Sequence, residues 1–312
     1  MLSLTASGCV TVHGERAVVP SATKAEAAQA LADFTDAYNK ADKAFDPALD
    51  AGRVTGALGA INQAGLKARR TNNPGGNPDH QPLELTDATF AIPRKAGWPR
   101  WFVADADSNR DEDRGPGDTR WLLVFVRSDA DQLWKVAYLS ILRAADVPRF
   151  AVDGDGWARP VGPDSEALAV APRDLGEEYA SYLQSGRPEH FAAGPNTTGW
   201  RETRKKNASL PGRSTQYIDQ PLDTGDFAPL GLATRDGGAL VFFATRHFER
   251  QTAAPGVELA VDPDVRALMS GEVKTTLTKE RVSGQAAMVP AARGGKVRVL
   301  NRLQGLVTAQ GA

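Results

Sequence analysis

Two short stretches of this chain are apolar at every position, which limits where their strands can lie. Residues 121–126 read WLLVFV and residues 239–244 read ALVFFA. Successive side chains of a strand point to opposite faces, so neither stretch can present a face to water. We therefore expect that two sheets of this protein, or one sheet and a second copy, cover each other. The last strand differs, because Lys296, Arg298 and Arg302 alternate with apolar residues and predict one solvated face.

The first half of the chain begins with helices and continues with strands. Thr23 and Glu26 have the spacing of a capping box that starts a helix. A second helix is predicted over 53–69, and a loop rich in Pro and Gly follows at 72–78. The inward face of the first helix is expected to carry Ala27, Leu31, Phe34, Tyr38 and Ala41. Strands are predicted at 83–92, 98–104, 121–127 and 133–142.

The second half repeats this order of elements. Asp174 and Glu177 have the spacing of another capping box, and Thr198 is expected to cap a helix that ends near Ala208. Strands are predicted at 216–221, 228–233, 239–249, 272–282, 285–290 and 296–307. Pro and Gly interrupt every periodic pattern between the two halves. We therefore divide the chain into a spacer at 1–22, a first domain at 23–145, a linker at 146–171 and a second domain at 172–312.

The order of helices followed by an antiparallel meander resembles the NTF2-like (cystatin-like) fold in each half. The resemblance rests on the element order of 23–145 and 172–310, and on no signature motif. It implies an α+β protein of two tandem domains, each with helices in front of a strongly curved antiparallel sheet. Sequence identity between the halves is negligible, so the repeat is one of architecture.

Cys9 is the only cysteine of the chain and ends the hexapeptide Leu-Thr-Ala-Ser-Gly-Cys. Small residues before such a cysteine are typical of a bacterial lipoprotein processing site, where the thiol becomes a thioether to diacylglycerol. Residues 1–8 are too short to hold both the basic region and the apolar segment of about 7–15 residues that export needs. We therefore expect the true start upstream, and a membrane anchor on the extracytoplasmic face. The alternative is a chance cysteine at a cytosolic terminus.

The whole chain is also similar to a family of uncharacterised bacterial lipoproteins. The stretches that carry this resemblance are 9–16, 215–221 and 301–305. The resemblance implies a location and an extent, and it brings no catalytic residues with it.

Acidic residues alternate along one predicted hairpin. Calcium loops carry such a pattern, and here the candidate ligands are Asp105, Asp107, Asn109 and Asp111. In neither reading frame does a Gly fall at the sixth loop position or a Glu at the twelfth. Our interpretation is a solvated acidic hairpin tip, and a weak calcium site is the alternative.

His247 is the strongest candidate for a catalytic group. NTF2-like enzymes often place a histidine and a carboxylate in the mouth of the cone, so the resemblance implies a role in acid–base catalysis. Asp219, Tyr217 or Glu249 would then orient the imidazole. The alternative is a histidine at the rim of the sheet, near a strand end. The four histidines have no zinc-ligand spacing and no cofactor-binding motif occurs, so we expect no cofactor.

Charge argues against a nucleic-acid partner. The formal net charge is −1, and we interpret the basic cluster Arg201, Arg204, Lys205 and Lys206 as a solvated helix face. Two functions remain. One is a non-catalytic, lipid-anchored binding or scaffolding module for a wall component, a protein or a small ligand. The other is an NTF2-like hydrolase, isomerase or dehydratase, which needs an open pocket around His247.

Overall fold

The structure is a computed structural model that describes residues 17–112, 114–292 and 294–312. Cys9 lies outside the described residues. The helices are α1 (Lys24–Ala44), α2 (Gly56–Asn72), α3 (Leu175–Ser185), α4 (Trp200–Asn207) and α5 (Pro263–Ala267). Among the described residues, no helix combines the length and the apolarity that crossing a bilayer requires.

Strands make up most of the remaining ordered structure. In the first half they are β1 (Val19–Pro20), β2 (Leu85–Ala91), β3 (Arg94–Lys95), β4 (Arg100–Ser108), β5 (Thr119–Arg127) and β6 (Lys135–Arg143). After them come β7 (Pro160–Val161), β8 (Ser209–Leu210), β9 (Arg213–Leu222), β10 (Leu230–Ala233), β11 (Ala239–Ala253), β12 (Met269–Ser270), β13 (Thr276–Val289) and β14 (Arg298–Gly311).

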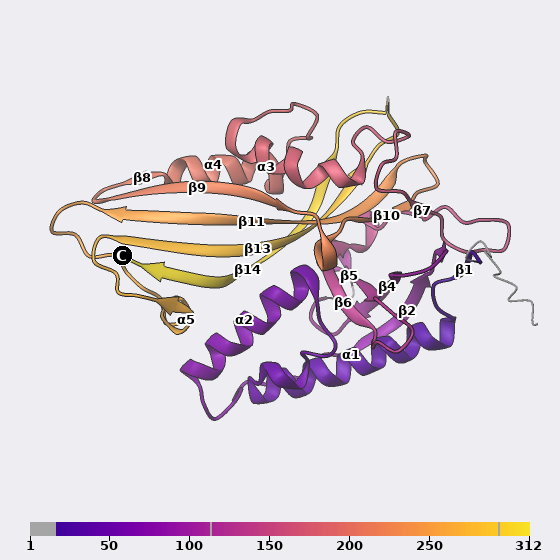
Figure 1. Cartoon of the computed structure of the whole chain (residues 1–312), viewed down its shortest axis with the longest axis horizontal. Coiled ribbons are helices and arrows are strands. Elements are labelled where there is room, and N and C mark those ends of the chain that lie inside the picture. Colours follow the sequence, from indigo (N-terminus) through magenta and orange to yellow (C-terminus); the bar gives the residue numbers. More distant parts are fainter. Residues whose placement is uncertain (1–16, 113, 293) are drawn as a thin grey trace, which may run out of the picture.

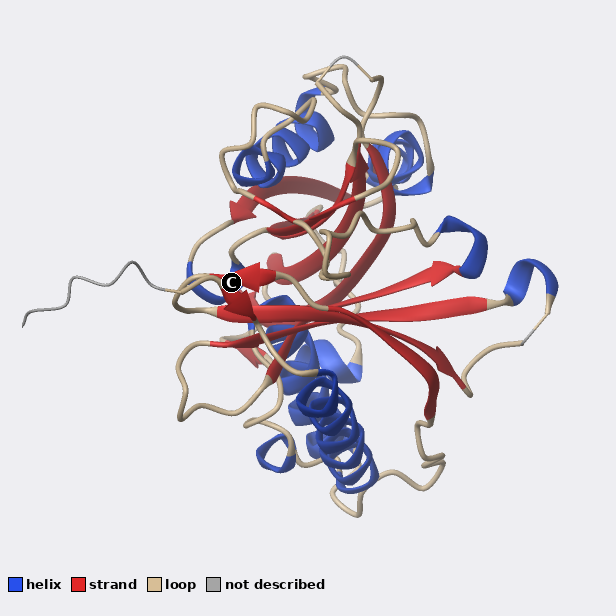
Figure 2. Cartoon of the chain, turned by 90° about the vertical axis from the view of Figure 1, so that its right-hand side faces the viewer, coloured by secondary structure: helices blue, strands red, loops and turns tan. Residues whose placement is uncertain are grey.

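Two main sheets form, one from each half of the chain. The smaller sheet has the order β2-β4-β5-β6, and every neighbouring pair is antiparallel. The larger sheet has the order β12-β14-β13-β11-β10-β7, with β9 also paired to β11. Helices α3 and α4 lie above the long strands of the larger sheet, and α1 and α2 lie below (Figure 1). The view at right angles shows helices on two outer sides with the strands between them (Figure 2).

The two sheets cover each other, as the doubly apolar stretches predicted. Leu123 and Phe125 of β5 pack against α1, whereas Leu122 and Val124 join a core that they share with the larger sheet. On β11 the alternation is the same. Leu240, Phe242 and Ala244 enter the shared core, and Ala239, Val241 and Phe243 pack under α3. We call the contact between the two halves the seam.

Polar contacts also cross the seam. The Tyr138 hydroxyl donates to the carbonyl of Phe227 (2.6 Å), and the carbonyl of Ala228 lies 3.1 Å from the same oxygen. The Asn301 amide on β14 donates to the carbonyl of Ile141 on β6 (3.0 Å). The Thr55 hydroxyl bonds to the Asp226 carboxylate. The seam is therefore a packed interior that hydrogen bonds also join.

The segment predicted as a linker is packed against both halves. Ala158 lies in the shared core, and β7 pairs with β10 of the larger sheet. Leu168 and Val170 are buried with α3. Helices followed by antiparallel sheets confirm the α+β class, while the boundaries at 145 and 172 stay a prediction.

Several local predictions hold and others are wrong. The capping box at Thr23 is confirmed, with its hydroxyl accepting from the Glu26 amide at 3.1 Å. Asp174 does not cap α3, because the 3₁₀ turn Pro172–Asp174 already holds its backbone in the helical region. Thr198 does not cap α4, because a π-helical turn, Pro195–Gly199, leads directly into that helix.

The separate strands predicted at 272–282 and 285–290 are one strand, because β13 continues through Gly284. A Cβ at this position would lie 3.3 Å from the Ala57 side chain and 3.5 Å from Tyr138. The glycine therefore allows α2 and β6 to approach the sheet closely.

The shared core predicts that the two halves unfold together. Leu122 and Leu123 are both 0% exposed and adjacent, and they face opposite cores. We expect Leu122→Ala to lower the free energy of unfolding by about 2–5 kcal/mol. We also expect it to shift a single unfolding transition that both halves share. Urea unfolding followed by tryptophan fluorescence and circular dichroism would measure this, with Leu123→Ala as the matched control. Two separate transitions, of which Leu122→Ala moves only one, would contradict a shared core.

Candidate functional site

The face of the larger sheet that lies under α3 and α4 changes from apolar to polar along its length. It is apolar at Val241 and Phe243, which pack under α3. Farther along the same face come buried polar residues, namely Thr245, His247 and Gln251 on β11, Ser283 and Gln285 on β13, and Thr215 and Asp219 on β9. The strand register explains the cluster, because His247 stands opposite Asp219 on β9 and Arg281 on β13.

His247 is buried in the middle of its strand and is not a rim residue. At His247, β11 is paired with β9 on one edge and with β13 on the other, and the strand continues beyond it to Ala253. The residue is 1% exposed, and its ring meets the Trp200 ring edge to face at 6.2 Å between centroids. The Nδ1 atom lies 3.3 Å from Nη2 of Arg302. A guanidinium can only donate, so His247 accepts this hydrogen bond and is neutral.

The charge state of His247 follows from these surroundings. Burial is the largest cause that lowers its pKa, to about 2, and the positive charges of Arg302, Arg204 and Arg281 act in the same direction. A histidine that exchanges protons in catalysis needs a pKa near the working pH and access to substrate. His247 has neither property.

The residues expected to orient His247 have other partners. The Asp219 carboxylate is held bidentately by Arg204, at 2.6 Å and 2.8 Å from its two Nη atoms. The Arg204 guanidinium also lies over the Tyr217 ring, 4.9 Å from its centroid. Glu249 accepts from Gln251 at 2.6 Å and lies 3.4 Å from Lys279. The structure thus gathers His247, Asp219, Tyr217 and Glu249 in one region and joins none of the last three to the imidazole.

The Arg204–Asp219 pair is a feature that sequence reasoning missed. Both side chains are buried, with exposed fractions of 6% and 1%. A buried charge is tolerated only when a partner compensates it, and a bidentate pair does so with favourable geometry. Within the basic cluster, Arg204 therefore points inward, whereas Lys205 and Lys206 are exposed. The solvated-face interpretation is wrong for Arg204.

Arg302 was predicted to lie on the solvated face of the last strand, and it also turns inward. Its guanidinium lies 4.3 Å from the Trp200 ring centroid, and burial lowers its pKa to about 10. No carboxylate among the described residues lies within ion-pair distance of it. Arg298, on the same strand, is solvated as expected, with 59% of its side chain exposed.

A cleft of about 610 Å³ opens beside this cluster, between α3, α4 and β9. Arg204, Asp219 and Tyr217 form its inner wall, and Arg201 and Lys205 line it from α4. Arg201 stacks over the Tyr182 ring at 5.3 Å. His247, Trp200 and Arg302 do not line the cleft, so a molecule in it would meet the ion pair and not the imidazole.

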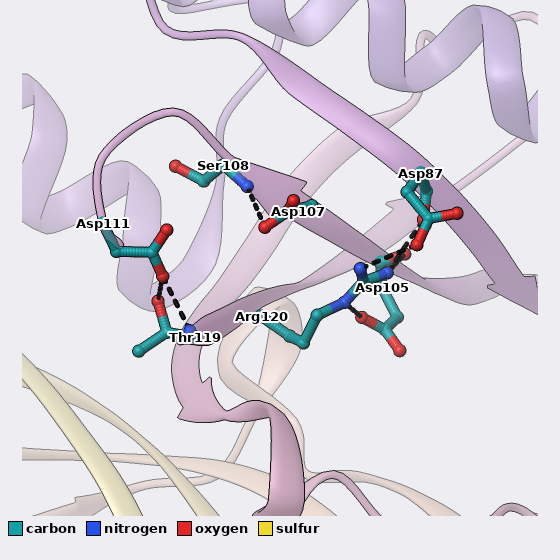
Figure 3. A network of polar contacts seen from close by, with 7 residues as sticks. All are labelled: Asp87, Asp105, Asp107, Ser108, Asp111, Thr119 and Arg120. Atoms are coloured by element: carbon teal, nitrogen blue, oxygen red, sulfur yellow. Dashed lines mark hydrogen bonds and ion pairs between the residues drawn. The ribbon is translucent and has the colours of Figure 1, made fainter. Parts of the chain in front are cut away.

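The acidic hairpin does not gather its candidate metal ligands (Figure 3). Asp105 is paired with Arg120 on β5 at 2.7 Å, and Asp111 accepts from the Thr119 amide at 2.7 Å. Asp107 accepts from the Ser108 amide, and Asn109 bonds to the backbone of Glu84 and Pro82. Within the described residues, no group of three or more His, Cys, Asp or Glu could hold a metal ion.

The depressed pKa of His247 predicts acid sensitivity. The pKa is about 6.5 when the chain is unfolded and about 2 when it is folded. The unfolded state therefore takes up the proton first, and stability is lost as the pH falls below 6.5. Between pH 6.5 and pH 5 the loss amounts to about 2 kcal/mol.

His247→Gln removes the titrating group and keeps an acceptor for Arg302. We expect wild type to lose about 2 kcal/mol more than this variant over that interval, as measured by urea unfolding at both pH values. Equal losses in the two proteins would refute the assignment of a neutral, buried imidazole.

Comparison with known proteins places these observations in a family. A family model described as a domain of unknown function (DUF8094) matches residues 18–311. An uncharacterised lipoprotein of Streptomyces avermitilis is 58% identical over 99% of this chain and 92% of its own length. One from Streptomyces coelicolor is 55% identical over the whole chain and 92% of its own length.

A second S. coelicolor protein with the same description is 28% identical, over 67% of this chain and 59% of its own length. No solved structure matches the chain significantly. The chain belongs to the DUF8094 family, a domain of unknown function.

Proposed function

We propose that this protein is a lipid-anchored lipoprotein on the extracytoplasmic face of the membrane, where it acts without catalysis as a binding or scaffolding module. Two relatives that are more than half identical to it carry the name lipoprotein. The sequence before Cys9 has the small residues of a lipoprotein processing site. A diacylglycerol at Cys9 would hold the folded part, which begins near Val19, close to the membrane surface.

One observation supports binding over catalysis. His247 is sealed under Trp200 with its Nδ1 facing Arg302, while the neighbouring cleft between α3, α4 and β9 stays open. The enzymatic alternative needs the imidazole and a carboxylate to meet a substrate together. In the part of the chain that the structure describes, the nearest candidate carboxylate, Asp219, is saturated by Arg204.

We also propose that each half is an NTF2-like domain. Support comes from the element order, since α1 and α2 precede the smaller sheet and α3 and α4 precede most of the larger one. In the first half, aromatic rings fill the space between helix and sheet. Phe102 stacks on Phe125 at 4.8 Å, and Phe34 and Trp134 meet this pair edge to face. These rings leave no room for a small ligand among themselves.

Metabolic labelling with palmitate tests the anchor. The protein is expressed in an actinobacterial host with its native upstream sequence, as wild type and as Cys9→Ala. We expect label and membrane association in the wild type, and loss of both in the variant with release of soluble protein. Ser3→Ala is the matched control and should behave as wild type. Equal labelling of wild type and Cys9→Ala would end the lipoprotein proposal.

A further inference from the structure

A second cavity, of about 740 Å³, lies at the seam. Both halves contribute to its wall, which includes residues of α2, α5 and β14. Apolar side chains dominate the wall, namely Leu58, Ile61, Trp121, Leu139, Ile141 and Leu303. Its size falls within the range of about 300–1,000 Å³ that small-molecule sites occupy, and such sites often lie between domains. We call it the seam pocket.

Gly65 in the middle of α2 keeps this pocket wide. Glycine destabilises a helix interior relative to alanine, so its presence calls for a steric reason. Two other glycines of α2 have one. Gly56 has φ +54° and a Cβ there would lie 2.4 Å from the Asp226 carbonyl, while at Gly59 it would lie 3.3 Å from Val54.

At Gly65 an added Cβ would meet only the end of the flexible Arg69 side chain, at 3.8 Å. Packing within the protein therefore does not require glycine at this position. Gly65 lines the seam pocket. The absence of a side chain at this position therefore preserves the volume of that pocket.

The wall of the pocket carries a cation, Arg69, that forms no ion pair among the described residues. Arg69 lines the wall beside Tyr38, and its guanidinium lies 5.4 Å from the Phe45 ring centroid. Its Nε atom is buried without a hydrogen-bond partner among the described residues, and no carboxylate there lies within ion-pair distance of it. The neighbouring Arg70, by contrast, points outward and pairs with Asp46 at 2.7 Å. A buried donor of this kind attracts an anionic oxygen.

Acidic side chains also line the pocket, near the end of α2. Asp262 and Asp264 line it from α5, and Asp264 accepts from the Asn72 amide at 2.7 Å. Arg281 lines the pocket as well, and its Nε lies 4.0 Å from the Glu249 carboxylate, which leaves Arg69 as the lining cation without an ion pair among the described residues. The pocket therefore suits a molecule that is apolar along its body and negative at one end, with that end at Arg69.

We propose that the seam pocket binds a single-chain amphiphile, whose hydrocarbon lies against α2, β6 and β14 and whose carboxylate or phosphate head is held by Arg69. This inference names a ligand class for the binding module proposed above, and rests on that proposal only for its setting at a membrane surface. The pocket itself does not depend on Cys9.

The test measures binding to the full-length Cys9→Ala chain, so its outcome is independent of the anchor. Palmitate, palmitoyl lysophosphatidate and hexadecanol share one hydrocarbon chain and differ in the head. Titration calorimetry should show saturable binding of at least one anionic amphiphile, at least tenfold tighter than hexadecanol. Tighter palmitate binding assigns a carboxylate head, and tighter lysophosphatidate binding assigns a phosphate head. No saturable binding of either anion would overturn the proposal.

Variants at Gly65 separate pocket filling from misfolding. Gly65→Ala should raise the melting temperature by about 2 °C through its helix propensity, and should weaken binding. Gly65→Leu should abolish binding while circular dichroism and the unfolding transition stay those of a folded protein. A folded Gly65→Leu protein that binds as tightly as wild type would refute the site.

Variants at Arg69 test recognition of the headgroup. Arg69→Met keeps the aliphatic stem and should weaken binding of the anion at least tenfold, with hexadecanol unaffected. Arg70→Met is the matched control on the next helix position and should leave both affinities unchanged. Equal losses for anion and alcohol in Arg69→Met, or an undiminished preference for the anion, would contradict headgroup recognition by Arg69.

Discussion

The packing of the two sheets against each other is the constraint on which the rest of this structure depends. Leu122 and Val124 meet Leu240 and Phe242 in one core, and all four are 0% exposed. Burial of apolar surface on this scale is the main favourable term in folding. Since each sheet uses part of one face for this contact, α1 packs on the outer face of the smaller sheet and α3 on the outer face of the larger one, while α2 packs against β6, β13 and β14. The layers α1, smaller sheet, larger sheet, and α3 with α4 follow from that division.

The same constraint decides where polar chemistry can occur. The larger sheet extends beyond the smaller one, and its face under α4 carries the buried polar cluster around His247. Removing charges from water is unfavourable unless they are paired, and Arg204 and Asp219 satisfy each other bidentately. Arg302 finds an aromatic ring and a neutral imidazole in place of a carboxylate. The arrangement resembles a structural polar core more closely than a catalytic centre, because its histidine is neutral and enclosed.

Local signals predicted local structure well where both partners lie within one turn. The capping box at Thr23 is an example, since its two hydrogen bonds join residues three apart. The same spacing at Asp174 misled, because Pro172 had already started a 3₁₀ turn and the side chain was no longer at the end of the helix. The break predicted between 282 and 285 is wrong as well, since Gly284 lies within β13 under a closely packed helix, and a single sequence does not show that packing.

The sequence by itself determined the α+β class, most strands, and the fact that 121–126 and 239–244 are covered on both faces, because these depend on the period of apolar residues along a few positions. Only the tertiary structure decided that the two sheets of one chain provide that cover. It also decided that Arg204 and Arg302 turn inward, and that a cavity remains at the seam beside Gly65. The physical reason is that these features depend on partners far apart in the chain, such as Arg302 and Trp200. Alternation of charged and apolar residues along a strand cannot show which helix will lie over that strand.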